Sequence, residues 1–160
     1  MSEEGRFEKI STRGAFPSNR KDSSIIFAET WTEEAAVFLF GGQRHLIGET
    51  DEFWKFTPEL KKWTKLPSGP SARSEAGVVF YQQNILVIGG YHASDIWGYH
   101  TSIGVWTQWM KNIPKCISEN VMLCEEFVYS VSNCKLGSFL YVINLHERKY
   151  SFTTHSLEVQ

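Results

Sequence analysis

The sequence has little charge imbalance and no long hydrophobic run, and each shortage excludes a class of protein. Its 16 Lys and Arg residues nearly balance 18 Asp and Glu residues, for a formal net charge of −2. A near-neutral chain argues against a nucleic-acid binder and against membrane attachment through a basic surface. The longest apolar stretches, such as residues 35–42, are far shorter than the ~20 residues that a membrane-spanning helix requires. We therefore predict neither a nucleic-acid partner nor a membrane partner.

Cysteine is scarce as well, with three residues confined to one region at positions 116, 124 and 134. Their spacings match neither a zinc-binding pattern nor a Cys-x-x-Cys redox pair. The sequence has no Asn-x-Ser/Thr glycosylation site, and its N-terminus carries charges of both signs without the apolar run of a secretory signal. These features favour free thiols in a reducing compartment. We therefore predict a cytoplasmic protein, with the nucleus as the alternative.

Aromatic residues, in contrast, are abundant. Eleven Phe, six Tyr and six Trp make up 14% of the chain, and β-sheets accommodate such side chains best. Twelve Gly residues suggest many short strands joined by tight turns. With 42% hydrophobic and 21% charged residues, the composition is that of a globular protein and not of a disordered one.

Two stretches of the chain repeat one order of motifs. Each begins with Pro-Ser-x-Arg, continues with two apolar runs of which the second ends in a glycine pair, and adds an aromatic run, a tryptophan and a proline. Short apolar runs bounded by Gly, Pro and Ser predict strands. The matched pieces are Pro17–Arg20 and Pro70–Arg73, Ser24–Phe27 and Gly77–Phe80, Val37–Gly42 and Ile85–Gly90, Trp54–Phe56 and Trp97–Tyr99, Trp63 and Trp106, and Pro67 and Pro114.

This order of motifs resembles the kelch repeat, and the resemblance covers residues 14–114. Each kelch repeat forms one four-stranded blade of a β-propeller, so the resemblance implies an all-β fold built from kelch-type blades. Phe56 and Tyr99 stand where kelch repeats usually carry a tyrosine in the third strand. The acidic residues Glu52 and Asp95 lie just ahead of them.

Weaker copies flank the two clear repeats. Residues 1–13, through Phe7–Ile10, resemble the last strand of a preceding blade, and residues 115–160 resemble a degenerate third repeat. In that third copy the expected strands are 121–124, 140–143 and 150–152, Ile117 stands at the arginine position, Asn144-Leu145 replaces the glycine pair, and Val159 replaces the tryptophan. The resulting divisions are 1–13, 14–67 (repeat 1), 68–114 (repeat 2) and 115–160 (repeat 3).

The chain therefore encodes about three four-stranded blades, whereas closed propellers have about four to eight. As a single chain it is expected to be an incomplete or open propeller, with aromatic blade faces that a soluble monomer avoids exposing. Three explanations remain open. The chain self-associates, so that two copies supply six blades; it pairs with another kelch chain; or it is a fragment of a larger kelch protein.

The resemblance implies a non-catalytic protein–protein interaction module, a scaffold or adaptor that binds partners through inter-strand loops at one face of the blades. In kelch proteins, contacts commonly come from residues just after the glycine pair and from the arginine ahead of the first strand. Because arginine suits bidentate recognition of carboxylates, the predicted partner is a protein or an acidic peptide. The alternative is that the two arginines bond loop carbonyls and join neighbouring blades. The matching positions are Arg20, Gln43, Arg44, His45, Arg73, Tyr91 and His92.

No local motif predicts catalysis, because no Ser-His-Asp or Cys-His order and no glycine-rich phosphate loop is recognisable. His45 and His92 occupy similar points of successive repeats, but no Asp, Glu or Cys ligand accompanies them in register. We therefore predict no enzyme, no cofactor and no metal. The alternative is part of a kelch-type enzyme similar to the copper-dependent sugar oxidases or the sialic-acid epimerases. An oxidase of that kind would need a complete, closed funnel of blades.

Overall fold

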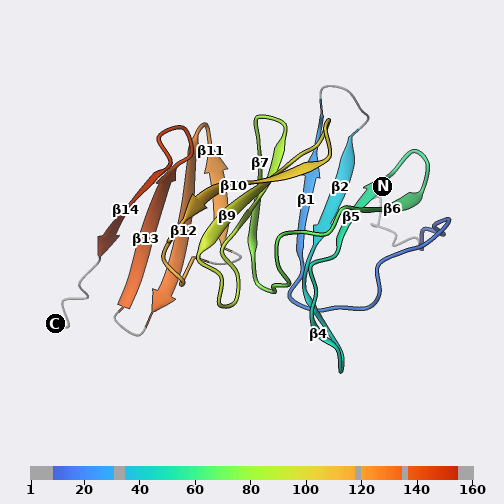
Figure 1. Ribbon diagram of the computed structural model, residues 1–160, viewed down its shortest axis with the longest axis horizontal. Helices are drawn as coiled ribbons and strands as arrows, with labels where there is room; N and C mark the ends of the chain where they lie inside the picture. Colours follow the sequence, from blue (N-terminus) through green and yellow to red (C-terminus); the bar gives the residue numbers. More distant parts are fainter. Residues whose placement is uncertain (1–8, 31–34, 118–119, 135–136, 155–160) are drawn as a thin grey trace, which may run out of the picture.

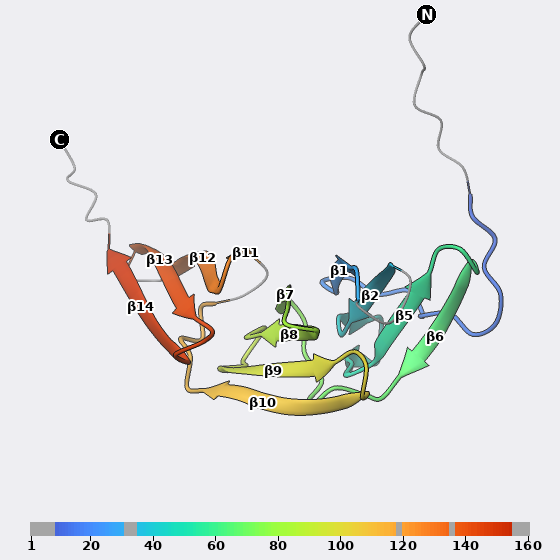
Figure 2. The same ribbon diagram turned by 90° about the horizontal axis from the view of Figure 1, so that it is seen from above.

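The computed structural model is all-β in the part of the chain that it describes, which comprises residues 9–30, 35–117, 120–134 and 137–154. Its strands form three four-stranded antiparallel sheets and one two-stranded hairpin. The predicted all-β fold of four-stranded sheets is confirmed to this extent. The three sheets follow one another in an open arc, with the first strand of each sheet on the inner side and the fourth on the outer side (Figures 1 and 2).

Sheet 1 contains the strands of repeat 1 in the order β1-β2-β5-β6. The hairpin β3–β4 is inserted after the glycine pair, between the second and third strands of the sheet. The insertion lengthens a loop and leaves the strand pairing intact. The bounds are β1 Ser24–Ala28, β2 Ala36–Phe40, β3 Gln43–Arg44, β4 Gly48–Glu49, β5 Phe53–Thr57 and β6 Lys62–Leu66.

Sheet 2 contains the strands of repeat 2, each paired with the next along the chain. Its second strand, β8, is buried along its whole length. Ile85 and Val87 pack in a core shared with sheet 1, whereas Leu86 and Ile88 pack in a core shared with sheet 3. Burial on both faces explains why this run is continuously apolar and does not alternate. The bounds are β7 Gly77–Tyr81, β8 Asn84–Ile88, β9 Asp95–His100 and β10 Val105–Lys111.

Sheet 3 corrects the assignment of strands within the third repeat. The apolar runs at 121–124, 140–143 and 150–152 do lie in strands, but a further strand, β12, runs between the first and second of them. The run 140–143 is therefore the third strand of its sheet and not the second, so Asn144-Leu145 does not occupy the glycine-pair position. Val159 lies outside the described residues. The bounds are β11 Val121–Cys124, β12 Phe127–Cys134, β13 Gly137–Asn144 and β14 Lys149–Thr154.

The strand predicted at Phe7–Ile10 lies partly outside the described residues. Residues 9–12 have no regular secondary structure. Arg13 forms an isolated parallel bridge with Lys62 of β6, and its backbone N–H donates to the carbonyl of Lys61 at 3.1 Å. The N-terminal segment thus touches the outer edge of sheet 1 at this point.

The aromatic residues fill the space between sheets 1 and 2. The ring of Phe53 in sheet 1 lies with its centroid 4.9 Å from that of Tyr99 and 5.2 Å from that of Trp106 in sheet 2. Phe40 also contacts Trp106, at 5.8 Å between centroids. Tilted and edge-on contacts of this kind add to the stabilisation from burial. Tyr99 and Trp106 have aromatic counterparts at the same positions of repeat 1, whereas Phe40 and Phe53 correspond to aliphatic residues of repeat 2, so repetition accounts for only part of this cluster.

Candidate functional site

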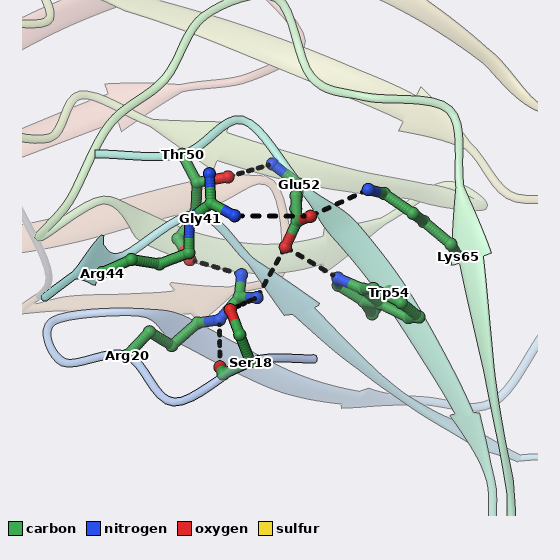
Figure 3. Close-up of polar contacts among 8 residues, drawn as sticks. All are labelled: Ser18, Arg20, Gly41, Arg44, Thr50, Glu52, Trp54 and Lys65. Carbon is green, nitrogen blue, oxygen red and sulfur yellow. Dashed lines mark hydrogen bonds and ion pairs between the residues drawn. The ribbon is translucent and has the colours of Figure 1, made fainter. Parts of the chain in front are cut away.

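Arg20 lies at the centre of a polar cluster that joins the start of sheet 1 to its glycine pair (Figure 3). Its Nη1 donates to the carbonyl of Gly41 at 3.1 Å, and its Nη2 bonds a carboxylate oxygen of Glu52 at 2.6 Å. Ser18, from the same Pro-Ser-x-Arg motif, accepts from the guanidinium through both its carbonyl and its hydroxyl. Only 4% of the arginine side chain is exposed. Arg20 therefore acts inside the repeat.

Glu52 is the common acceptor of this cluster. Besides Arg20, it accepts from Lys65 Nζ at 2.8 Å and from the indole N–H of Trp54 at 3.3 Å. Burial opposes ionisation of the carboxyl, but the hydrogen bonds from Lys65, Arg20 and Trp54 outweigh it and lower its pKa from 4.5 to about 2. Arg44 stands farther away, at 3.9 Å, and is the weakest of its partners.

Repeat 2 builds the same cluster from its own residues. Arg73 donates through Nη1 to the carbonyl of Gly89 at 2.9 Å and to Asp95 at 2.8 Å, and through Nη2 to Ser71 at 2.6 Å. The indole of Trp97 donates to Asp95 at 2.8 Å. Arg73 is 2% exposed. The arrangement matches the alternative in which the arginine holds a loop carbonyl, and it leaves no exposed guanidinium at this position for a partner's carboxylate.

The glycine pairs allow successive repeats to approach closely. Gly41 and Gly89 both have positive φ, +63° and +58°. A Cβ on Gly41 would collide with the carbonyl oxygen of Arg73, and one on Gly89 with the carbonyl oxygen of Ile117. Ile117 is fully buried at the arginine position of repeat 3. The glycine of each repeat therefore rests against the arginine position of the next, where only glycine fits.

A concave surface opens beside the first of these clusters, at the hairpin β3–β4. It has a volume of about 570 Å³. Glu49 of β4 accepts hydrogen bonds from the backbone N–H and hydroxyl of Ser74, at 2.9 and 2.6 Å, which fixes the hairpin against repeat 2. No acidic side chain lines this basic pocket in the part of the chain that the structure describes. Its lining residues are Asn19, Arg20, Lys21, Gln43, Arg44, His45, Leu46 and Gly48.

The basic pocket thus brings together four of the predicted site residues, Arg20, Gln43, Arg44 and His45. Tyr91 and His92 line a different and smaller concavity of about 290 Å³, together with Glu75 and Lys115 among others. Their rings lie 3.9 Å apart between centroids. The predicted residues therefore form two separate groups, and the seventh, Arg73, lines neither.

Four lining residues of the basic pocket were not predicted, namely Asn19, Lys21, Leu46 and Gly48. Lys21 has a side chain 71% exposed, and Leu46 is 93% exposed at the tip of the hairpin. Asn19 precedes the arginine of the repeat motif. Lys21 could have been suspected as a site residue because it follows Arg20, and Leu46 because it is an apolar residue in a polar loop. Neither stands out without the geometry of the hairpin.

Among the described residues there is no group of three or more His, Cys, Asp or Glu side chains placed to hold a metal ion. His45 and His92 line different pockets. Neither Cys116 nor Cys124 is in a disulfide, and the thiol of Cys116 lies within hydrogen-bond distance of the Tyr141 hydroxyl, at 3.0 Å. Within the described ranges there is no helix long and apolar enough to cross a membrane.

Comparison with known proteins adds no identification. No protein-family model matches the sequence, and no curated protein matches it at a significant level. The likeness to kelch repeats therefore stays a prediction from the order of motifs.

Proposed function

We propose that this chain is a non-catalytic interaction module of kelch-type propeller blades that binds an acidic segment of a partner protein in the cytoplasm or nucleus. The observation that carries the proposal is the basic pocket at β3–β4, where Lys21, Arg44 and His45 line a concave surface with no acidic residue among its described lining. The blade interpretation is supported by the radial arrangement of three sheets and by the recurrence of the arginine–acid–tryptophan cluster in repeats 1 and 2.

Arg44 is the side chain best suited to bind a carboxylate from outside. Its contact with Glu52 is long, at 3.9 Å, and Glu52 is already bonded by Arg20 and Lys65 at 2.6 and 2.8 Å. The Nε of Arg44 is buried and has no hydrogen-bond partner among the described residues. Because the Arg44 side chain is 27% exposed, an incoming carboxylate would form a charge-assisted pair with the accessible part of its guanidinium.

Lys21 and Leu46 complete the chemistry of the pocket. Lys21 forms only a 3.5 Å contact with the exposed Asp22, so its ammonium group remains accessible to a second negative charge. Leu46 offers an exposed apolar contact beside the two cations. The pocket therefore fits a peptide that carries acidic residues next to an aliphatic one.

The test is binding of the purified protein to an array of short peptides graded in acidic content. Binding should rise with the number of Asp and Glu residues and weaken strongly at ~1 M salt, where the Debye length falls to ~3 Å. Arg44→Ala should weaken binding about 10-fold, since a hydrogen bond between charged groups contributes about 1.5 kcal/mol. Lys21→Ala should have a smaller effect in the same direction.

Lys149→Ala is the matched control, because its side chain is 77% exposed on sheet 3, away from the pocket. It removes the same charge and should leave binding unchanged. Arg73→Ala should lower the melting temperature, since it would leave Asp95 without its buried cation. Equal binding to neutral and acidic peptides, or an Arg44→Ala protein that binds as wild type, would refute the proposed function.

A further inference from the structure

Both ends of the arc carry an uncovered apolar sheet face. On sheet 1, Ile25 and Phe27 point away from sheet 2 and are 62% and 55% exposed. On sheet 3 the residues that point away from sheet 2 include Met122 at 64% and Val131 at 58%. Exposed apolar faces of this kind mark an interaction surface or an aggregation hazard. The two end sheets are seen edge-on in Figure 2.

The uncovered face of sheet 1 repeats a face that is covered elsewhere in the chain. Six residues of this face occupy the same register positions in sheet 1 as six residues of sheet 2. Sheet 2 packs on sheet 1 through those six residues. We call this the front face of a sheet. On sheet 1 it consists of Ile25, Phe27, Val37, Leu39, Phe56 and Trp63. Their equivalents on sheet 2 are Val78, Phe80, Ile85, Val87, Tyr99 and Trp106, all within the core shared with sheet 1.

The uncovered face of sheet 3 corresponds to the face with which sheets 1 and 2 each pack on the sheet that follows in the chain. We call this the back face of a sheet. On sheet 3 it consists of Met122, Tyr129, Val131 and Leu140. The equivalent residues of sheet 1 are Ile26, Phe38, Phe40 and Phe53, which pack on sheet 2. Those of sheet 2 are Val79, Leu86, Ile88 and Ile96, which lie in the core shared with sheet 3.

Inside the chain, the back face of sheet 1 packs on the front face of sheet 2, and the back face of sheet 2 packs on sheet 3. The front face of sheet 1 and the back face of sheet 3 remain uncovered. The outer faces thus continue a series of interfaces that the molecule already contains. Where sheets 1 and 2 meet, Phe53 contacts Tyr99 and Trp106, at 4.9 and 5.2 Å between centroids. The same geometry at the free ends would place Leu140 against Phe56 and Trp63.

Hydrogen bonding and charge agree with such an interface. The indole of Trp106 donates across the boundary between repeats to the carbonyl of Pro67, at 3.1 Å. The equivalent indole, Trp63, has no hydrogen-bond partner within the described residues and remains available. Lys65, at the edge of the front face, is bonded to Glu52 at 2.8 Å, so covering this face would bury no unpaired charge there. On the back face of sheet 3, a hollow of about 450 Å³ lined by Met122 and Leu140, among others, leaves room for an aromatic side chain.

We propose that two copies of this chain associate head to tail, with the front face of sheet 1 in each copy covered by the back face of sheet 3 in the other. The number of sheets selects a pair of chains. Closed rings have about four to eight blades, and with three sheets per chain two copies supply six, whereas a third copy would exceed the range. The proposal rests on the blade geometry of the proposed function but not on its peptide-binding pocket.

Sedimentation equilibrium over a range of protein concentrations tests the assembly. The wild-type chain should have twice its monomer mass of 18.4 kDa. Phe27→Lys on the front face and Met122→Glu on the back face should each give the monomer mass. Both residues are more than half exposed, so the far-UV circular dichroism of each variant should stay that of the wild type. Ile25→Lys and Val131→Glu serve as second variants of each face if either of the first pair unfolds.

A mixture of the two variants distinguishes head-to-tail pairing from any symmetric contact of like faces. Mixing Phe27→Lys with Met122→Glu leaves one interface native and gives the other a lysine opposite a glutamate, so the mixture should regain twice the monomer mass. Ile103→Lys and Ile103→Glu, in an exposed turn of sheet 2, are the controls and should not alter the mass. A monomeric wild type, growth beyond two copies, or a mixture that stays monomeric would overturn the proposal. Peptide binding by such a monomer would show that the proposed function stands without it.

Discussion

Each of the first two repeats carries one acid that holds the cation of its own repeat. Glu52 and Asp95 bond Arg20 and Arg73 at 2.6 and 2.8 Å, and each also accepts an indole N–H. Buried cations are costly unless such partners are supplied. The pairs link the entry of the first strand to the third strand, so they set the geometry of the loops around the basic pocket.

The depressed pKa of Glu52 makes its contribution to stability dependent on pH. Its carboxyl has a pKa of about 2 in the folded protein, against 4.5 as the ordinary value. The stabilisation is therefore complete above about pH 4.5 and is lost as pH falls toward 2. We expect Glu52→Gln to lower the free energy of unfolding by about 1–2 kcal/mol at neutral pH, allowing for solvent screening, and by much less near pH 2. Urea unfolding across this pH range measures the difference.

Glu147→Gln is the control for that measurement. Glu147 is exposed and forms a loose 3.7 Å contact with Lys149, and exposed pairs contribute little. Its variant should match the wild type at every pH. A Glu52→Gln protein whose destabilisation is the same at pH 2 as at neutral pH would show that the carboxylate charge is not what stabilises the cluster.

The residues of the arginine clusters and, as an alternative, their bonds to loop carbonyls could be predicted from the sequence, but their bonds to the acids could not. Motif order singled out Arg20 and Arg73 and placed the acids just ahead of the third strand. That each acid bonds the arginine of its own repeat follows from the position of the third strand relative to the entry of the first. Lys21 and Leu46 of the basic pocket depend in the same way on how the β3–β4 hairpin folds back.

At the scale of elements, the glycine pairs decide how closely one repeat can approach the next. We expect Gly89→Ala to lower the free energy of unfolding by at least about 3 kcal/mol, because its methyl group would collide with the backbone carbonyl of Ile117. Gly48→Ala is the matched variant, since φ there is +91° but nothing lies within 4 Å of the added atom. It should cost about 1–2 kcal/mol from backbone strain alone.

Urea unfolding of the two glycine variants separates collision from strain. Gly48 has the larger positive φ, so strain alone would make its substitution at least as costly as that of Gly89. Equal losses, or a greater loss at Gly48, would contradict a close contact between repeats.

Most strands of the three four-stranded sheets could be predicted from the sequence, and the omission of β12 has a physical explanation. In β12, Ser130 and Ser132 alternate with apolar residues, whereas the neighbouring β13 contains the continuous run Leu140–Ile143. A search for continuous apolar runs therefore finds β13 but does not find β12. Ser130 is nevertheless 1% exposed, because the core it faces is formed by tertiary packing that no single strand reveals.

At the scale of the whole molecule, sheet 2 belongs to both hydrophobic cores, so the three sheets should unfold together. The tryptophans of the described residues lie in β5, β6, β9 and β10, so tryptophan fluorescence reports mainly on sheets 1 and 2. We expect Ile143→Ala, in the core between sheets 2 and 3, to cost about 2–5 kcal/mol. It should shift the unfolding midpoints seen by fluorescence and by far-UV circular dichroism equally.

Ile103→Ala is the control, since its side chain is 67% exposed and its truncation should shift neither midpoint. If Ile143→Ala moved only the circular dichroism transition, sheet 3 would be an independent unit. The shared strand β8 would then not couple the two cores.

The pairing order of the strands also has a consequence for synthesis. Every four-stranded sheet is built from strands consecutive in the chain, interrupted only by the local hairpin β3–β4, so chain closure costs little entropy. Each sheet can pair as soon as its own residues leave the ribosome. The back face of a sheet stays uncovered until the next sheet has been translated. During that interval the nascent chain is most exposed to aggregation and most dependent on chaperones.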